Sequence, residues 1–518
     1  MRKTLAVILC ALMILPLAFV GISAAEPTVI TTAEAFAGMA ADGNYKLGAD
    51  IAIAASWGAD PVTTFTGTLD GDGHTVTVSA PLFVQFAGTI KNLTINGAVV
   101  KEGTANEVAS YAGAIANNVP KNSTNVVIDN ITNNASITFK FRGGALIGQI
   151  SSGSIVTITN CVNNGAILGG NMAGGFVGYS QSKGSMTVDE KTVTMPSTLT
   201  VMNCVNNGSV TIDVSKELTG LAGGIVGRYG GDDKSYDSIS NVIIKNCLNT
   251  GAITGTSQTA GILAHARSSN VVIENCTNKG VILSTYTAAN GGTADAAGIF
   301  GATHGKDGHY CMVTVSKCVN EADVTSKNAR AAGIVGYVWC GGQGDNYLFS
   351  QVVDCVNKGN IKGGSFVSQF TAYTNDTKNM EGAKQNTTMT GVGLGTTGRC
   401  DEAQRTDAQF YDAFVGVSSA STGANYNIDV YIVDPLDYVA YSEGTEANRI
   451  PIANKPEGLR IVTAAEAEAA AKALGQIGYV APQSTNPSQP TGDAAVWVIV
   501  IAGVSLLGMG IALKARKA

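Results

Sequence analysis

NVIIKNCLNTGAITG (Asn241–Gly255) and TAGILAHA (Thr259–Ala266) form one unit of a repeat, and the next unit starts at once with NVVIENC (Asn270–Cys276). A cysteine marks the same position in each unit, at spacings of 29 to 43 residues along the 518-residue chain. A repeat of this length without helical periodicity indicates stacked β-coils. The aligned cysteines are Cys161, Cys204, Cys247, Cys276, Cys318 and Cys355, and Leu93 and Ile131 extend the series towards the N-terminus.

Apolar residues stand five and three positions before each cysteine, as Val242 and Ile244 do before Cys247. This alternation predicts a short strand with one face inward. It breaks at the residue before the cysteine, usually asparagine, where we expect a bend. A second asparagine follows two residues after each cysteine, and glycine usually comes two residues later, which predicts a corner lined by an amide ladder. These second asparagines are Asn163, Asn206, Asn249, Asn278, Asn320 and Asn357.

A block of small and apolar residues completes each unit, and we expect it to form the third strand. Its clearest copies are AGGFVGY (Ala173–Tyr179), LAGGIVGR (Leu221–Arg228) and AAGIVGY (Ala331–Tyr337). Small residues here let neighbouring backbones approach closely.

The composition agrees with an all-β chain of many short strands and tight turns. Charged residues make up 14% and aromatic residues 6%, while glycine occurs 63 times. The net charge of −6, without a basic stripe, argues against a nucleic-acid partner. No pattern for a cofactor is present, so we expect none.

We therefore predict a parallel β-helix of about eight coils over residues 61–375. Residues 26–60 are expected to form an N-terminal cap with a helix, because a coil buries its inner face only against its neighbours. Residues 376–480 lack the repeat and are expected to form a C-terminal α+β cap or spacer. This segment contains a strand-like stretch (Asn427–Asp434) and an Ala/Glu-rich helix candidate within Glu457–Gly478.

Two apolar terminal segments predict export and anchoring. Residues 1–25 have the basic start, apolar run and small residues of a signal peptide. A Pro/Ser-rich linker (481–493) leads to a predicted transmembrane helix (494–513) and a basic cytoplasmic tail (514–518). The chain is thus expected at the cell surface, with the membrane as one partner.

Two resemblances carry these expectations further. The linker, span and tail resemble the C-terminal sorting signals of Gram-positive surface proteins, which implies attachment to the cell wall after cleavage between Thr491 and Gly492. Pro490 directly precedes Thr491, whereas that pattern has one intervening residue. The Gly-Ile-Val-Gly blocks resemble those of right-handed β-helix surface proteins with GLUG-type repeats, which implies a right-handed parallel β-helix. This fold hosts adhesins, stalks and polysaccharide lyases.

The chain has ten cysteines, and the six aligned ones are expected to be buried, reduced core residues. Cys311 and Cys340 lie off that column, in insertions expected at the same corner of neighbouring coils. They predict a disulfide, with two alternatives: a zinc-like site with His304 and His309, or unpaired surface residues.

Two clusters of charged residues are explained by local structure rather than by a metal or catalytic site. Asp70, Asp72 and His74 are explained by a tight hairpin turn. Arg228, Asp232, Asp233 and Lys234 are explained by a solvated loop, because neighbouring units carry no matching carboxylates.

Most length variation between units falls between the glycine-rich block and the next first strand. Such insertions emerge along one side of a solenoid, often the binding side, although unconstrained loops would vary in the same way. They contain aromatic residues suited to a glycan or protein ligand. The insertions are Ser180–Ser197, Gly230–Ser240, Thr303–Tyr310 and Val338–Leu348, and the candidate binding residues are Tyr229, Tyr236, His304, His309, Tyr310, Trp339 and Tyr347.

The favoured function is therefore a non-enzymatic, adhesin-like surface protein. A polysaccharide lyase or hydrolase on the same scaffold is the first alternative, and a groove with clustered carboxylates and basic residues would distinguish it. A passive envelope or spacer protein is the second.

Overall fold

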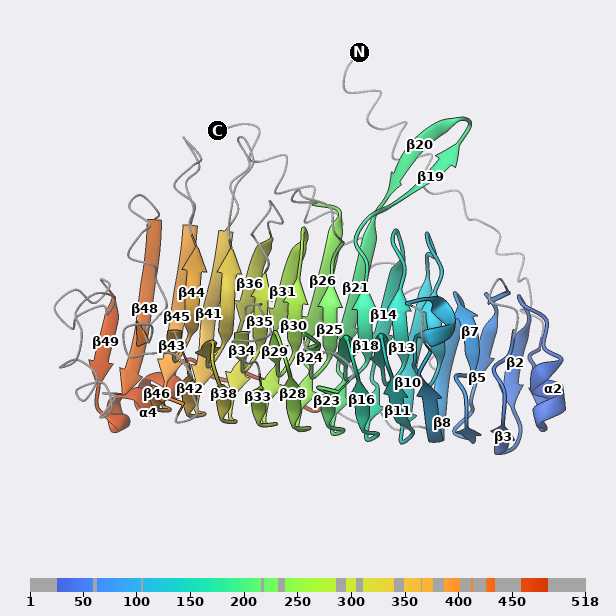
Figure 1. The fold of residues 1–518 in the computed structure, drawn as a ribbon, viewed down its shortest axis with the longest axis horizontal. Coiled ribbons are helices and arrows are strands. Elements are labelled where there is room, and N and C mark those ends of the chain that lie inside the picture. Colours follow the sequence, from blue (N-terminus) through green and yellow to red (C-terminus); the bar gives the residue numbers. More distant parts are fainter. Residues whose placement is uncertain are drawn as a thin grey trace, which may run out of the picture. The chain divides into compact units, whose positions relative to one another are not determined.

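The structure is a computed structural model, and its coils can be followed in Figure 1. Residues up to Tyr479 form one compact unit, described here, and residues 480–518 form a second. The residues that the structure describes are 26–58, 63–103, 106–215, 219–231, 238–285, 295–303, 311–339, 349–364, 366–375, 386–400, 411–412, 425–433 and 458–482. The predicted signal peptide and transmembrane helix lie outside them, as does nearly all of the linker.

A single coil passes through three parallel sheets. One complete coil consists of β21 (Ser197–Met202), β22 (Val205–Asn206), β23 (Val210–Ile212), β24 (Leu221–Gly223) and β25 (Val226–Tyr229). The first three strands belong to a long sheet, β24 to an eight-stranded sheet and β25 to a ten-stranded sheet. The next coil begins at β26 (Ser240–Lys245), which pairs with β21 in parallel and in register, with Val242 beside Leu199. The predicted parallel β-helix is confirmed.

The other strands occupy the same places in their own coils. The eight-stranded sheet also contains β12 (Arg142–Gly144), β17 (Met172–Gly174), β29 (Thr259–Ala260), β34 (Asp295–Ala297), β39 (Arg330–Ala332), β43 (Phe366–Ser368) and β47 (Tyr411–Asp412). The ten-stranded sheet also contains β4 (Thr64–Phe65), β7 (Phe83–Phe86), β9 (Ala116–Val119), β13 (Ile147–Ile150), β18 (Val177–Ser180), β30 (Leu263–Ala266), β35 (Phe300–Thr303), β40 (Val335–Trp339) and β44 (Thr371–Asn375). The block expected to be one strand is thus two strands that belong to different sheets.

The long sheet continues over the whole stack. Its other strands are β1 (Thr28–Ile30), β2 (Asn44–Leu47), β3 (Ile51–Ile53), β5 (Thr68–Asp70), β6 (Thr75–Val78), β8 (Thr89–Lys101), β10 (Val126–Asn133), β11 (Ser136–Phe139), β14 (Ile155–Thr159), β15 (Val162–Asn163), β16 (Ile167–Gly169), β27 (Leu248–Asn249), β28 (Ile253–Gly255), β31 (Asn270–Glu274), β32 (Thr277–Asn278), β33 (Ile282–Ser284), β36 (Met312–Ser316), β37 (Val319–Asn320), β38 (Val324–Ser326), β41 (Phe349–Asn357), β42 (Ile361–Gly363), β45 (Asn386–Gly393), β46 (Thr397–Arg399), β48 (Asn425–Val433) and β49 (Leu459–Val462).

The stack extends beyond both boundaries expected from the sequence. At the N-terminal end, β2 and β3 already pair in parallel with β5 and β6. At the C-terminal end, β45 pairs with β41, β48 with β45 and β49 with β48. Residues 376–480 therefore include further strands of the same stack, rather than only a separate cap or spacer.

Aromatic side chains fill the N-terminal end beneath the short helix α2 (Ala33–Ala37). Thr32 caps this helix by accepting a hydrogen bond from the Ala35 N–H at 3.2 Å. Phe36 packs on Phe83, whose ring lies 4.7 Å from that of Phe65. The Trp57 indole N–H donates to the Met39 carbonyl at 3.1 Å. These aromatic side chains pack beneath α2 at the N-terminal end of the stack.

The helix predicted near the C-terminus is α4 (Ala464–Ala473), which starts at a capping box formed by Thr463 and Glu466. Its buried Ala467 packs on Val319, Val356 and Val392, which lie on the outer face of the long sheet. The chain then runs back along that face, where the Tyr479 N–H donates to Thr277 Oγ1 at 2.8 Å. Among the described residues, no helix is both long enough and apolar enough to span a membrane.

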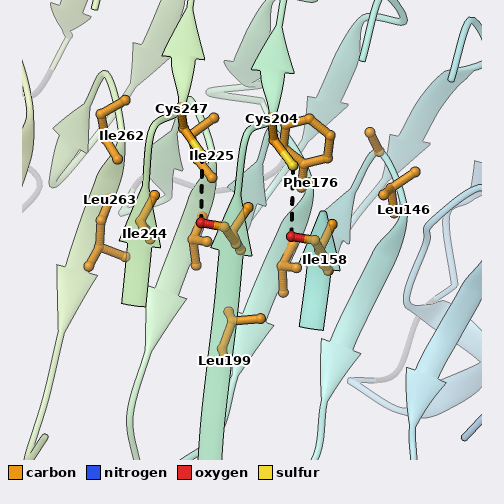
Figure 2. Close-up of a cluster of buried hydrophobic side chains, with 14 of the residues drawn as sticks. Leu146, Ile158, Phe176, Leu199, Cys204, Ile225, Ile244, Cys247, Ile262 and Leu263 are labelled. Atoms are coloured by element: carbon orange, nitrogen blue, oxygen red, sulfur yellow. Dashed lines mark hydrogen bonds between the residues drawn. The ribbon is translucent and has the colours of Figure 1, made fainter. Parts of the chain in front are cut away.

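The aligned cysteines point into the core, as predicted. All six are fully buried and are free thiols. Cys204 lies 3.2 Å from the Met202 carbonyl and 3.9 Å from the Ile158 carbonyl of the previous coil, the second contact being drawn in Figure 2. Each thiol therefore packs as a small apolar group and still donates to a backbone carbonyl beside the bend.

The bend before each cysteine has a left-handed backbone. Asn203 and Asn246 have φ values of 56° and 50°, a region that asparagine tolerates better than most residues. Lys317 and Asp354 occupy the same place in later coils, with φ of 52° and 54°. The predicted bend is confirmed.

The second asparagine column forms a continuous buried ladder. Asn206 donates through Nδ2 to Oδ1 of Asn249 at 2.8 Å, and Asn249 donates to Asn278 at the same distance. Each amide also donates to the carbonyl two residues later, as Asn249 does to Gly251 at 2.9 Å. Every ladder amide is therefore bonded both within its coil and between coils. The ladder consists of Asn133, Asn163, Asn206, Asn249, Asn278, Asn320 and Asn357.

Glycine follows this ladder because the coils approach closely, not because φ is positive. A Cβ on Gly251 would lie 2.0 Å from the Gly208 carbonyl oxygen of the previous coil. Glycine is therefore required at this corner because a larger residue would collide with the neighbouring coil.

Candidate recognition edge

The insertion corner is the place where the chain leaves the ten-stranded sheet and returns to the long sheet. Of the four predicted insertions, Ser180–Ser197 is the one that the structure describes throughout. It forms a two-stranded antiparallel hairpin, β19 (Gly184–Val188) and β20 (Lys191–Met195), which projects away from the coils (Figure 1). The predicted corner therefore carries a folded element rather than only a loop.

The sequence SMTVDEKTVTM (Ser185–Met195) explains why this insertion folds. Asp189 and Glu190 form its turn with φ of 47° and 62°, and two left-handed central residues are typical of the turn that matches a twisted two-residue hairpin. Thr and apolar residues alternate on both strands. Met186 therefore lies opposite Val193, and Thr187 lies opposite Thr192.

One face of the hairpin is apolar and exposed. Met186, Val188 and Val193 are 39%, 43% and 43% exposed, and period-two alternation puts them on one face, with the threonines on the other. An isolated two-stranded ribbon is marginally stable in water, because one of its faces stays unburied. Three exposed apolar side chains side by side suit an interaction site, and Lys191 shares their face near the tip.

The base of the hairpin is held against the neighbouring coils. Asn122 Nδ2 donates to the Ser185 carbonyl at 3.2 Å, and the Lys183 N–H donates to Ser240 Oγ at 2.8 Å. Gly153, with φ of 73°, lies so close that a Cβ there would be 2.9 Å from Cβ of Met195. These contacts orient the ribbon before any partner binds.

Tyr229 is not a surface binding residue, contrary to the prediction. It ends β25 with its side chain fully buried, and its hydroxyl donates to the Ser197 carbonyl at 3.0 Å. It belongs to the same buried core cluster as Val226, so it faces the interior at the point where the insertion begins. Its role is to hold the insertion corner rather than to bind.

The remaining predicted binding residues are not described by the structure. Trp339 ends β40, and only its backbone is described. Within the described ranges, no group of three or more His, Cys, Asp or Glu side chains could hold a metal ion. The residues outside the described ranges are Tyr236, His304, His309, Tyr310 and Tyr347, together with Cys340 and the possible sortase residues Thr491 and Gly492.

Cys311 lies in the core, not on an exposed insertion as expected. It is a fully buried free thiol, and its Sγ lies 3.9 Å from Oγ of Ser269 in the previous coil. Ser240 and Ser197 hold the same place in earlier coils and are equally buried. Burial raises the pKa of the Cys311 thiol to about 11, so this sulfur is a poor nucleophile.

Arg228 is also buried rather than part of a solvated loop, which corrects the prediction. Its side chain is 8% exposed and its guanidinium lies 5.1 Å from the Tyr179 ring centroid. Arg142 lies 4.7 Å from the same ring and 4.9 Å from that of Tyr111. These stacked arginines and tyrosines join the eight-stranded and ten-stranded sheets. Asp232, Asp233 and Lys234 lie outside the described residues.

In the eight-stranded sheet, Asp295 of β34 forms an ion pair with Arg330 of the neighbouring strand β39. Arg330 Nε donates to Asp295 Oδ1 and Nη2 to Oδ2, and the Asp295 side chain is 1% exposed. Arg330 also stacks on Tyr337 at 4.0 Å. Both carboxylate oxygens of Asp295 are bonded to Arg330. This pair therefore links two neighbouring coils and leaves neither oxygen free to bind a substrate.

The acidic turn near the N-terminus is a turn, as expected, but not a hairpin. Asp72 has φ of 48° and its N–H donates to Asp70 Oδ1 at 2.9 Å. The flanking strands β5 and β6 pair with neighbouring coils instead of with each other. His74 and Asp50 are 3.1 Å apart, and the Thr75 N–H and His74 together lower the pKa of the Asp50 carboxyl.

A groove of about 400 Å³ lies between the long sheet and the segment after α4. Its floor includes Leu248, Val319 and Val356. At its rim Glu321 bonds both Lys358, at 3.1 Å, and Lys279, at 3.4 Å. One carboxylate thus faces two lysines, and Lys472 also lines the groove, so its rim keeps a net positive charge.

The sequence analysis overlooked the exposed residues of the hairpin, Met186, Val188 and Val193. The signal was present, since two alternating runs flank the two-residue turn Asp189–Glu190. The candidates chosen from the sequence were aromatic residues and histidines, and this insertion contains neither.

Comparisons with known proteins give limited similarity. No protein-family model matches the chain. Halomucin from Haloquadratum walsbyi is 30% identical over 151 residues, which cover 24% of this chain and only 2% of halomucin. A solved structure from Bacteroides ovatus, titled “putative immunoglobulin A1 protease”, has 14% identity and a TM-score of 0.28, covering 80% of this chain and 86% of its own. That score is too low to support an inference.

Proposed function

We propose that this chain is a cell-surface β-helix that recognises a protein partner through its insertion corner, in an adhesin-like role without catalysis. The observation that carries the proposal is the hairpin β19–β20, whose Met186, Val188 and Val193 are exposed on one face. Met and Val suit a protein partner better than a sugar, because they offer apolar area without hydrogen-bonding groups.

Surface display follows from the terminal segments of the sequence. The N-terminal signal-like segment accounts for export, and residues 494–518 account for retention. The local similarity to halomucin, a protein named as a mucin, is in keeping with an extracellular setting. Deleting residues 494–518 should release the protein into the medium, and a wall-linked peptide ending at Thr491 would reveal sortase cleavage.

The test displays the full-length chain on a heterologous host cell and measures adhesion to protein and glycan arrays. A variant with residues 184–195 replaced by a short Gly-Ser turn should lose most of the protein binding. Replacing Trp339 and Tyr347 with alanine, and measuring adhesion to the same arrays, tests the aromatic insertions separately. Unchanged binding after hairpin replacement would overturn the proposal, and breakdown of a polysaccharide by the chain would favour the lyase or hydrolase alternative.

A further inference from the structure

The groove beside α4 lies between the outer face of the long sheet and the segment that follows the helix. On the sheet side it is lined by one outward-facing column, whose members pair in register on four successive coils: Leu248, Thr277, Val319 and Val356. α4 covers Val319 and Val356, which are 5% and 2% exposed, whereas Leu248 is only partly buried. The helix therefore covers one end of this column and leaves Leu248 accessible in the groove.

The charged side chains that line the groove leave an excess of positive charge. Lys279, Lys358 and Lys472 carry three positive charges and Glu321 carries one negative charge, so two positive charges remain. The C-terminal end of α4, which also lines the groove, contributes only about half a negative charge and does not cancel this excess. A groove with this balance of charge attracts an anion.

The lysines keep hydrogen-bond donors that Glu321 does not use. Lys358 donates to one Glu321 oxygen at 3.1 Å, and the Lys279 ammonium lies 3.4 Å from the other. Each ammonium has three N–H donors, and the two lysine side chains are 49% and 50% exposed. Glu321 therefore holds two ammonium groups close together while both keep donors for a second carboxylate.

The rest of the lining suits a compact apolar group. Leu248 and Val319 lie on the sheet side, while Ile477 and Tyr479 come from the segment that follows α4. The Tyr479 N–H donates to Thr277 Oγ1 at 2.8 Å, which holds this segment against the coils. The volume of about 400 Å³ falls within the roughly 300–1,000 Å³ of small-molecule sites, so the groove fits a small molecule rather than a polymer.

We propose that this groove binds a small organic acid, with its carboxylate at the lysines and its apolar body against Leu248 and Ile477. Charge complementarity favours the carboxylate. The apolar lining favours an acid with a ring or branched body over an inorganic anion, which has no apolar surface to bury. The site goes beyond the proposed function, because it lies on the long sheet and uses none of the hairpin residues.

Three probes of nearly equal shape separate the effect of charge from that of shape. Benzoate, benzamide and benzamidine carry a negative charge, no charge and a positive charge on the same ring. Isothermal titration calorimetry measures their binding to the full-length chain in phosphatidylcholine nanodiscs, with empty nanodiscs as the blank. We expect benzoate to bind about fivefold more tightly than benzamide, and benzamidine to bind most weakly. Acetate, which has the charge without the ring, should bind more weakly than benzoate.

Charge variants test the lysine cluster. Lys472→Gln should weaken benzoate binding about threefold. Glu321→Gln should strengthen it by a similar factor, because it removes the negative charge that competes for the same ammonium groups. Neither change should alter benzamide binding. Lys362→Gln, at an exposed lysine of β42 that does not line the groove, is the control and should leave benzoate binding unchanged.

A variant of the floor tests the apolar part of the site. Leu248→Thr should weaken benzoate and benzamide alike, because it removes apolar area beneath the ring. Val205→Thr makes a similar change in the same column one coil earlier, outside the groove, and should have no effect. Equal thermal midpoints for all variants establish that the coils are folded.

The anion site would be overturned by a lack of benzoate binding, by equal affinity for benzoate and benzamide, or by weaker benzoate binding in Glu321→Gln. An effect of Val205→Thr as large as that of Leu248→Thr would place the ring outside the groove and overturn the site as well. Protein binding through the hairpin depends on none of these residues, so either proposal can fail without the other.

Discussion

At the corner after each cysteine the side chains stay inside and bond to the neighbouring coils, whereas at the insertion corner the chain leaves the body. Asn249 at the first corner is fully buried and bonded on both sides. Val193 beyond the second corner is 43% exposed. The first corner repeats because the side chains of each coil bond to those of the next. The insertion corner varies because the coils hold only the base of each insertion. Regularity therefore marks stability in this protein, and irregularity marks the surface that we propose for recognition.

The largest expected effect comes from alkaline pH at the cysteine corner. Burial raises the pKa of Cys204, Cys247 and Cys276 well above the usual 9.0. The unfolded chain therefore loses these protons first, so the thiols' contribution is complete below pH 9.0 and is lost as pH rises towards their folded pKa values. Each such thiol should lower stability by about 1.4 kcal/mol per pH unit in that window. For Cys311 the pH range over which this stability is lost ends near the folded pKa of about 11.

Denaturant titrations between pH 8 and pH 10.5 measure this loss. Cys247→Ala should make the decline shallower, while Thr192→Asp on the hairpin serves as a control with the wild-type slope. If the free energy of unfolding fell equally steeply with pH in Cys247→Ala and wild type, the buried thiols would not be the cause of the loss. The native thiols should also resist alkylation, and all should react in denatured protein without a reductant.

The next largest effect is expected for the asparagine ladder. Asn249→Ala leaves Asn206 without its acceptor, Asn278 without its donor and the Gly251 carbonyl without a partner. Buried groups left unbonded cost about 1–3 kcal/mol each, so the free energy of unfolding should fall by about 3 kcal/mol or more. Asn207→Ala removes an exposed amide from the neighbouring column and should cost less than about 1 kcal/mol. A similar loss in both variants would show that burial does not distinguish the two columns.

The bend offers a substitution that should stabilise the protein. Lys317 has φ of 52° and is exposed, in a column where Asn246 and Asn275 bond at 3.2 Å. Lys317→Asn suits the left-handed backbone and gives Asn275 a further amide neighbour. We expect a gain of about 0.5–1 kcal/mol, measured by denaturant unfolding. Lys317→Val should be destabilising, and a gain there would refute the conformational argument.

The regular corner could be predicted from the sequence, and the irregular parts could not. The cysteine and asparagine columns gave the bend, the ladder and the parallel stacking, because each follows from one side chain in a fixed register. The stack beyond residue 375 was missed because Gly391 and Val430 take the place of the cysteine, although the backbone still pairs. Tyr229, Arg228 and Cys311 were assigned to the surface because they border insertions. Their burial depends on how three sheets meet, which no local pattern encodes.

The smallest effect is expected for the stability of the hairpin variants. Val193→Asp alters a side chain that is 43% exposed on a ribbon held to the body only at its base, through Asn122, Gly153 and Ser240. Substitutions at such surface positions usually change the free energy of unfolding by less than about 0.5 kcal/mol. The thermal midpoint should therefore match that of wild type, even though binding to the proposed protein partner is lost. A large drop in the midpoint would mean that the apolar face packs against the protein's own coils, and the contrast between the two corners would then no longer hold.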